Sequence, residues 1–351
     1  MTVYLVNIGL ILFWRLYYVR NRIADSRKYY CAIVAIQWIL ISGLRDWSIG
    51  ADTENYYVMF EKAQSTSWIS AFRSLLNYSL QDVLSRDPGY LILTKIFQLF
   101  SGSYQLFLFA VAAFFMSMMA VWIYRYSASP CTSFILFSTL FFSYETLTRQ
   151  NIAIALVVFL GYDLIRKRKF WSFATVAFLA FLIHKTSLVF VPMYFLCSLP
   201  VTWRYRSLCA ILIAMAGYFG KVFYVPIAEW IGIDSALIDY AEGGAELYAT
   251  LLILLCVVIW ILYPRIKKHR NDAGMLFHIN SMSLMSAVLI FHNQSFMRIQ
   301  LYFSLFLMIT IPEVINTVKR EYRLLIYLLF GLVMIFYLIL QKPEYQFFFM
   351  R

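Results

Sequence analysis

The sequence predicts an all-α polytopic membrane protein that forms one integral membrane domain over residues 1–351. The chain is 62% hydrophobic and only 14% charged, which leaves too little polar surface for a soluble protein of this length. Apolar stretches long enough to cross the hydrocarbon layer, about 20 residues for a helix, recur from end to end. Between them lie short polar segments, several of them rich in Lys and Arg, as in the cytoplasmic loops of membrane proteins.

We expect about twelve transmembrane helices, several of them shorter than a full span. They cover roughly residues 2–19, 29–44, 103–123, 131–144, 149–165, 171–183, 186–199, 207–224, 247–263, 274–291, 297–315 and 323–340. Segment 89–100 is also apolar, but it is too short to span comfortably, so we place it at the interface or in a re-entrant turn. With that placement, every strongly basic loop, such as Arg166-Lys167-Arg168-Lys169, falls on one face, which the positive-inside rule assigns to the cytoplasm.

The segment 45–101 is then a long extracytoplasmic loop with amphipathic or re-entrant helices. Tyr56-Tyr57-Val58-Met59-Phe60 and Trp68-Ile69-Ser70-Ala71-Phe72 give it apolar helix faces rich in Tyr and Trp. Such residues favour the headgroup layer of a membrane. We expect this loop to form a roof beside a cavity between the spanning helices.

Composition argues against several other classes of protein. The formal net charge is +12, but the basic residues lie in short loops between apolar helices, so we expect membrane topology rather than nucleic acid to explain them. No zinc-ligand spacing, coiled-coil heptad or internal repeat is evident, and the absence of a repeat gives no support to an inverted-repeat transporter. We expect no cofactor and no extracytoplasmic disulfide.

The outer face collects polar and ionisable residues from separate parts of the chain, and in a compact bundle their helix ends converge. Several Arg side chains near the membrane plane suit a lipid-linked diphosphate, because guanidinium groups bind phosphate oxygens bidentately and stay charged. A His or Asp beside them can take a proton from a sugar hydroxyl, and Tyr or Trp can stack on a sugar face. These are the components of glycosyl transfer from a lipid diphosphate donor.

We assign diphosphate binding to Arg45, Arg149 and Arg298; the simpler alternative is that they snorkel to lipid headgroups. Two residues compete for the role of catalytic base. His184 would be kept neutral if the charge of Lys185 lowered its pKa, whereas Asp52 would be placed by a sharp turn at Gly50. The simpler alternative for His184 is an interfacial histidine that only makes hydrogen bonds, and the simpler alternative for Asp52 is a helix cap.

Further residues are candidates for contacts with the sugar or other parts of the substrate: Tyr56, Asp87, Tyr90, Glu145, Gln150 and Lys185. Asp87-Pro88-Gly89 is also a common turn sequence. The acid-x-acid pattern of Asp52 and Glu54 is a possible site for Mg²⁺ or Mn²⁺. We expect no metal ion, because the arginines would already supply the positive charge.

An ordered set of short motifs resembles the EpsG/Wzy-type bacterial polysaccharide polymerases. The motifs are Arg45-x4-Gly50-x-Asp52-Thr53-x2-Tyr56, Asp87-Pro88-Gly89-Tyr90, Arg149-Gln150-x-Ile152-Ala153, Ala180-x3-His184-x2-Ser187 and Arg298-x3-Tyr302. Each is weak alone, but they run in the family's order over about 45–310. The usual acid before Pro-Gly in the family is Glu, and Asp87 departs from it with a shorter side chain.

The resemblance implies a polymerase in the bacterial cytoplasmic membrane, with an active site facing the outside. It would transfer an oligosaccharide chain from undecaprenyl diphosphate onto the non-reducing end of another lipid-linked repeat unit. It also implies a GT-C-like fold, kinship with O-antigen ligases, and contact with membrane lipids, a flippase and a chain-length regulator. Three alternatives stay open: a flippase or transporter of lipid-linked sugars, a membrane acyltransferase that modifies surface glycans, and a scaffold protein.

Overall fold

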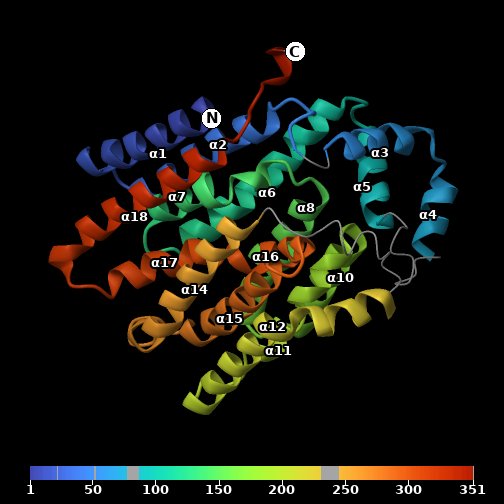
Figure 1. Ribbon diagram of the computed structural model, residues 1–351. Coiled ribbons are helices and arrows are strands. Elements are labelled where there is room, and N and C mark those ends of the chain that lie inside the picture. Colours follow the sequence, from blue (N-terminus) through green and yellow to red (C-terminus); the bar gives the residue numbers. More distant parts are fainter. Residues whose placement is uncertain (22, 51–52, 77–86, 231–244, 351) are drawn as a thin grey trace.

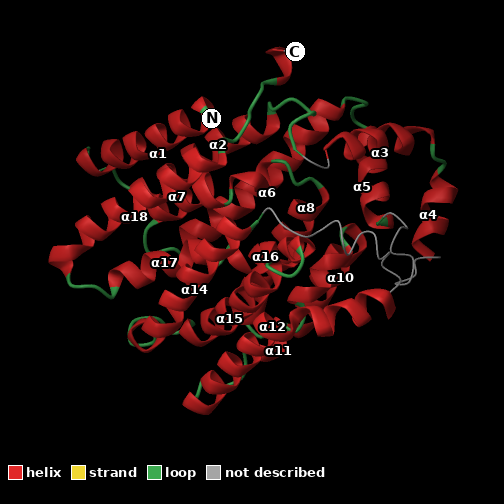
Figure 2. Cartoon of the chain, in the orientation of Figure 1, coloured by secondary structure: helices red, strands yellow, loops and turns green. Residues whose placement is uncertain are grey.

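The computed structural model describes residues 1–21, 23–50, 53–76, 87–230 and 245–350, and the secondary-structure elements in these ranges are all helical (Figure 2). The α-helices are α1 (Thr2–Arg20), α2 (Ser26–Gly43), α3 (Thr53–Ser65), α4 (Trp68–Leu76), α5 (Pro88–Gln98), α6 (Tyr104–Tyr126), α7 (Pro130–Leu140), α8 (Arg149–Ile154), α9 (Gly161–Arg166), α10 (Phe170–Ile183), α11 (Met193–Leu196), α12 (Trp203–Trp230), α14 (Glu246–Ile266), α15 (Ala273–Ile290), α16 (Met297–Ser304), α17 (Leu307–Asn316) and α18 (Arg320–Gln341).

The all-helical architecture with membrane-spanning helices agrees with the sequence analysis. Within the described residues, five helices are long and apolar enough to cross a bilayer: α1, α6, α14, α15 and α18. The pair Gln294–Ser304 and Leu307–Asn316 would count as a sixth span, although it bends by 59°. Of the other expected spans, 29–44 coincides with α2, of 18 residues, and 207–224 with α12, of 28 residues, whereas the rest coincide with shorter or interrupted helices. The number twelve and the GT-C likeness stay predictions.

Two prolines inside helices each leave a backbone carbonyl without its helical hydrogen bond. A polar side chain from a neighbouring helix donates a hydrogen bond to each of these carbonyls. Pro312 in α17 cannot bond to the carbonyl of Met308, which instead accepts a hydrogen bond of 2.5 Å from the Ser133 hydroxyl of α7. Pro264 in α14 likewise frees the carbonyl of Trp260, which accepts a hydrogen bond of 3.1 Å from Arg206 of α12. Because lipid offers no hydrogen bonds, these contacts satisfy carbonyl groups that would otherwise be unpaired inside the membrane.

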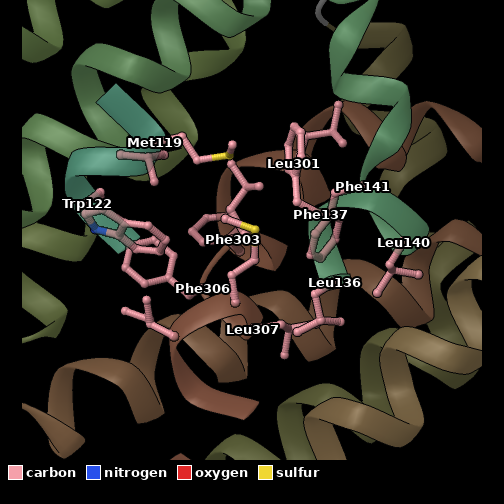
Figure 3. Close-up of a cluster of buried hydrophobic side chains, with 14 of the residues drawn as sticks. Met119, Trp122, Leu136, Phe137, Leu140, Phe141, Leu301, Phe303, Phe306 and Leu307 are labelled. Atoms are coloured by element: carbon pink, nitrogen blue, oxygen red, sulfur yellow. The ribbon is translucent and has the colours of Figure 1, made fainter. Parts of the chain in front are cut away.

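The main apolar core includes side chains from most of the helices, and one part of it lies between α6, α7, α16 and α17. Figure 3 shows Trp122 of α6, Phe137 of α7 and Phe306 beside α17 among a cluster of buried side chains from these helices. The rings of Trp122 and Phe306 meet edge to face, with centroids 5.2 Å apart. This core fixes the helices whose outer ends carry the polar motif residues.

Helices α3, α4 and α5 of the expected outer loop form a group at one side of the bundle (Figure 1). Helix α5 has 11 residues, or about 16 Å at 1.5 Å per residue, and is therefore too short to span, as expected. Its buried Lys95 donates hydrogen bonds to the carbonyls of Ala63 (3.0 Å) and Thr66 (2.5 Å) at the end of α3. These bonds join α3 to α5, and α5 in turn packs against α10.

An ion-pair cluster joins loops that the charge pattern places on the inner side. Arg270 lies 2.5 Å from a carboxylate oxygen of Asp272 and 2.8 Å from one of Glu313. The Tyr162 hydroxyl donates to the other oxygen of Asp272 at 2.6 Å, and Arg270 also donates to the carbonyl of Tyr126. The cluster therefore ties together the ends of α6, α9, α15 and α17.

The two termini meet on the opposite side, at the end of α2. The amino group of Met1 donates a hydrogen bond of 2.7 Å to the carbonyl of Pro343. Beyond α18, the tail of residues 342–350 runs past the end of α2 (Figure 1). There the backbone N–H of Asp46 donates to the carbonyl of Gln346 at 2.8 Å, and the backbone N–H of Phe348 donates to the carbonyl of Leu44 at 3.0 Å. Both termini therefore lie close together beside the end of α2.

Candidate functional site

A cavity of about 560 Å³ opens among α1, α3, α8, α16 and the C-terminal tail. This volume is in the usual range for small-molecule sites. Six of the residues that the sequence analysis selected line it, and they come from four separate segments of the chain: Tyr56, Glu145, Arg149, Gln150, His184 and Arg298. Segments that are far apart in the sequence therefore converge in the fold on one cavity.

Asp87 joins two of these residues from behind the cavity wall. Its Oδ2 lies 3.2 Å from Nη1 of Arg149 and 3.2 Å from Nδ1 of His184. Asp87 is buried and precedes α5, which begins at Pro88. A Cβ on Gly89 would lie 2.7 Å from backbone atoms of Leu182, so only glycine lets α5 approach the end of α10 this closely. The Asp-Pro-Gly sequence thus places a carboxylate beside His184.

His184 follows the last residue of α10, and its backbone N–H donates to the carbonyl of Ala180 at 2.8 Å. Burial lowers the pKa of the imidazole below its usual value; Asp87 opposes this effect, and the charges of Arg149 and Arg298 add to it. A neutral ring beside the Asp87 carboxylate carries its proton on Nδ1, leaving the Nε2 lone pair free. In the part of the chain that the structure describes, Nε2 is buried and has no hydrogen-bond partner. This arrangement suits a general base.

Two guanidinium groups line the same cavity. Arg149, the first residue of α8, lies over the rings of Tyr56 and Tyr90, with its guanidinium carbon 5.2 and 5.8 Å from their centroids. These rings and Asp87 fix the direction of its side chain. Arg298 is exposed, and its backbone carbonyl accepts a hydrogen bond of 2.7 Å from the Gln150 amide. Gln150, the motif residue next to Arg149, therefore connects α8 to α16.

The remaining motif residues support the segment around His184. The hydroxyls of Thr186 and Tyr302 lie 3.1 Å apart, which links the turn after His184 to α16. The backbone N–H of Ser187 donates to the carbonyl of His184 at 3.0 Å, closing that turn. Ser187 and Tyr302, from the last two sequence motifs, therefore support the turn after His184 without lining the cavity.

Arg45 lies outside the cavity lining, with only 2% of its surface exposed. Its guanidinium donates to the carbonyl and hydroxyl of Ser42, and the Ser42 hydroxyl donates to the carbonyl of Glu145 at 2.8 Å. Burial lowers the pKa of Arg45, and the nearby carboxylate of Glu145 opposes this. Diphosphate binding by Arg45 stays a prediction; in the structure this side chain supports the cavity wall from behind.

Glu145 lies in the cavity wall between Arg45 and the N-terminal helix. One carboxylate oxygen accepts a hydrogen bond from the Tyr4 hydroxyl. Burial raises the pKa of Glu145 to about 7, although the Tyr4 hydrogen bond and the charge of Arg45 act in the opposite direction. The Tyr4 hydrogen bond therefore joins this carboxyl group to the N-terminal helix α1.

Two of the other selected residues, Tyr90 and Lys185, do not line the cavity. Asp52, the rival base, falls outside the described residues. Tyr90 is buried behind Arg149, and Lys185 is half-buried and does not line the cavity. The cavity also includes Tyr4 and Glu344, which the sequence analysis did not select, because nothing in the sequence connects the two ends of the chain to this site.

The fold and the site together define a helical membrane protein with a cavity lined by two guanidinium groups and by His184, which pairs with Asp87 behind the cavity wall. The model of the EpsG family matches residues 28–349, so the chain belongs to the EpsG family, as its motifs indicated. No curated protein and no solved structure matches it. Membership of this family points to a polysaccharide polymerase-type function in a membrane.

Proposed function

We propose that this protein is a glycosyltransferase that polymerises lipid-linked oligosaccharides at the outer face of the bacterial cytoplasmic membrane. The donor is an oligosaccharide chain on undecaprenyl diphosphate, and the acceptor is the non-reducing terminal sugar of a second lipid-linked unit. Flippase and chain-length regulator partners are part of the same proposal, as they follow from the family resemblance.

In this proposal, Arg149 and Arg298 bind the diphosphate oxygens of the donor. Nε2 of His184 takes the proton from the acceptor hydroxyl, whose oxygen forms a bond to the anomeric carbon of the donor. The bond from that carbon to the diphosphate breaks, and its electron pair leaves with the lipid diphosphate. The two guanidinium groups stabilise the negative charge that develops on the leaving group. We propose that they do so without a metal ion.

The observation that carries this proposal is the placement of Asp87 between Arg149 and His184, at 3.2 Å from each. One carboxylate thus couples a phosphate-binding group to a proton acceptor. The carboxylate orients His184 so that Nε2 is the basic atom, and it favours the imidazolium that forms during the reaction. A base beside a leaving-group site is what transfer to a sugar hydroxyl requires.

Purified protein in detergent, supplied with lipid-linked repeat units, tests the proposal. We expect the wild type to make polymer and Arg149→Ala and His184→Ala to make none, with each variant still folded. Arg73→Ala is a matched control, because Arg73 is an exposed arginine on α4, away from the cavity lining. Since detergent allows no transport across a membrane, polymer made there excludes a flippase. Wild-type activity in Arg149→Ala would contradict the proposal.

A further inference from the structure

The C-terminal tail forms part of the cavity wall. Pro343 and Glu344 line the cavity, although they lie beyond the last transmembrane helix. The Tyr345 hydroxyl donates to the carbonyl of Ile41 at 2.7 Å, and Phe347 pairs with Arg45 in an antiparallel bridge. With the bond from Met1 to Pro343, these contacts fix the tail against α1 and α2. The tail is thus an ordered element of the site.

The ionisable residues lining the cavity carry both signs of charge. Arg149 and Arg298 supply positive charge, whereas Glu145 and Glu344 supply carboxylates. The two acids come from the turn before α8 and from the tail, and Tyr4 lies with them in the lining. A diphosphate would be repelled by carboxylates, so these acids are suited to another part of the substrate.

Glu145 has a vacant hydrogen-bonding position. One oxygen accepts from Tyr4, but the other, Oε2, is buried and has no partner within the described ranges of the chain. Only 2% of the residue is exposed, and it nevertheless belongs to the cavity lining. Buried carboxylate oxygens are normally hydrogen-bonded, so an unpaired one in a cavity wall indicates a ligand that brings a donor group.

We propose that Glu145, with Tyr4 and Glu344 of the C-terminal tail, binds the acceptor sugar. This inference rests on the proposed polymerase function and names the acceptor class: a neutral or amino sugar, whose hydroxyl or ammonium groups donate hydrogen bonds to the two carboxylates. A uronic acid at the same position places a third negative charge beside them and is rejected. Arginines therefore hold the donor diphosphate, and carboxylates hold the sugar that attacks it.

Two binding measurements on the purified full-length protein separate the two parts of the cavity. The first probe is the lipid-free repeat-unit oligosaccharide, obtained by hydrolysis of the polysaccharide that the native host makes. The second is inorganic diphosphate. We expect Glu145→Gln and Glu344→Gln each to weaken oligosaccharide binding by roughly tenfold, as loss of a hydrogen bond to a charged group does, with diphosphate binding unchanged. Arg149→Ala should show the reverse pattern.

Glu344→Gln keeps the test informative if Glu145→Gln unfolds, because Glu344 is exposed on the tail. Glu61→Gln is the matched control, since Glu61 is an exposed acid of α3 that does not line the cavity. Unchanged oligosaccharide binding in folded Glu145→Gln and Glu344→Gln overturns the acceptor site. Unchanged diphosphate binding in Arg149→Ala contradicts the donor assignment instead, so failures of the two proposals are distinguishable.

Discussion

Nδ1 of His184 lies 3.2 Å from Oδ2 of Asp87, although 97 positions separate the two residues in the sequence. The contact forms where the start of α5 meets the end of α10. It gives His184 an oriented ring with Nε2 unoccupied, and it gives the Asp-Pro-Gly motif a specific task. The sequence alone allowed that motif to be a simple turn.

The first prediction concerns the pH dependence of polymerisation. The base must be neutral to act, so activity is present above the pKa of His184 and is lost as pH falls through it. Burial holds that pKa below the usual value of about 6.5, so we expect wild-type activity to persist into mildly acidic solution. In Asp87→Asn, the interaction that raises the pKa is lost, so the acidic limit should move to still lower pH.

We also expect the maximal rate of Asp87→Asn to fall by roughly 10²–10⁴-fold, because the imidazole loses the partner that orients it and stabilises its charged form. Asp87→Glu should recover part of that rate, since a carboxylate is retained. Initial rates of polymer formation measured across pH 5–8 check both effects. If Asp87→Asn lost activity at the same pH as the wild type or at a higher pH, Asp87 would not act on His184.

The second prediction tests the close approach of α5 to α10. In Gly89→Ala, the new methyl group meets backbone atoms of Leu182, so α5 must move and draw Asp87 away from His184. We expect polymer synthesis to fall at least tenfold and the protein to lose roughly 1–3 kcal/mol of stability. Activity assays and thermal unfolding in detergent measure the two quantities.

Gly331→Ala is the control for this substitution. Gly331 lies in α18, and a Cβ there has no other atom within 4 Å, so alanine should be neutral or stabilise the helix by up to about 1 kcal/mol. Equal activity of the Gly89 and Gly331 variants would mean that the packing of α5 on α10 does not position the site.

The sequence predicted the helical membrane fold and the residues that converge on the cavity, because both depend on local patterns. Apolar length indicated the spans, and short motifs indicated Arg149, His184 and Arg298. It did not separate Arg45 from the other two arginines, since burial depends on how α2 ends against Glu145. Nor did it indicate Tyr4 or Glu344, because contact between the two ends of the chain produces no hydrophobic periodicity and no motif with a fixed spacing.

The third prediction concerns the ion-pair cluster on the side opposite the termini. Arg270→Met removes the cation that Asp272 and Glu313 share in a largely buried position, where side-chain exposure is 10% for Arg270 and 8% for Asp272, and leaves Asp272 with Arg166 at 3.5 Å. Asp272 ionises readily in the folded protein because Arg270 and Tyr162 keep its pKa low against the effect of burial. Removal of one partner from such a cluster costs about 3–5 kcal/mol. Thermal unfolding in detergent at pH 7 measures this loss.

Lys167→Met provides the comparison, because the side chain of Lys167 is 56% exposed where it pairs with Asp163 at 2.5 Å. An exposed pair of this kind contributes about 0–1 kcal/mol, so its loss should change the unfolding temperature little. If both substitutions lowered the stability by similar amounts, the Arg270 cluster would contribute no more to the fold than an exposed ion pair does.

The most direct test of the central claim counts the two products of the reaction. Purified protein is incubated with lipid-linked repeat units, and released undecaprenyl diphosphate is measured together with new glycosidic linkages. We predict one lipid diphosphate for each linkage with wild-type protein and neither product with His184→Ala. Linkages formed without equivalent release of lipid diphosphate, or formed equally fast by His184→Ala, would contradict a transfer reaction at this site.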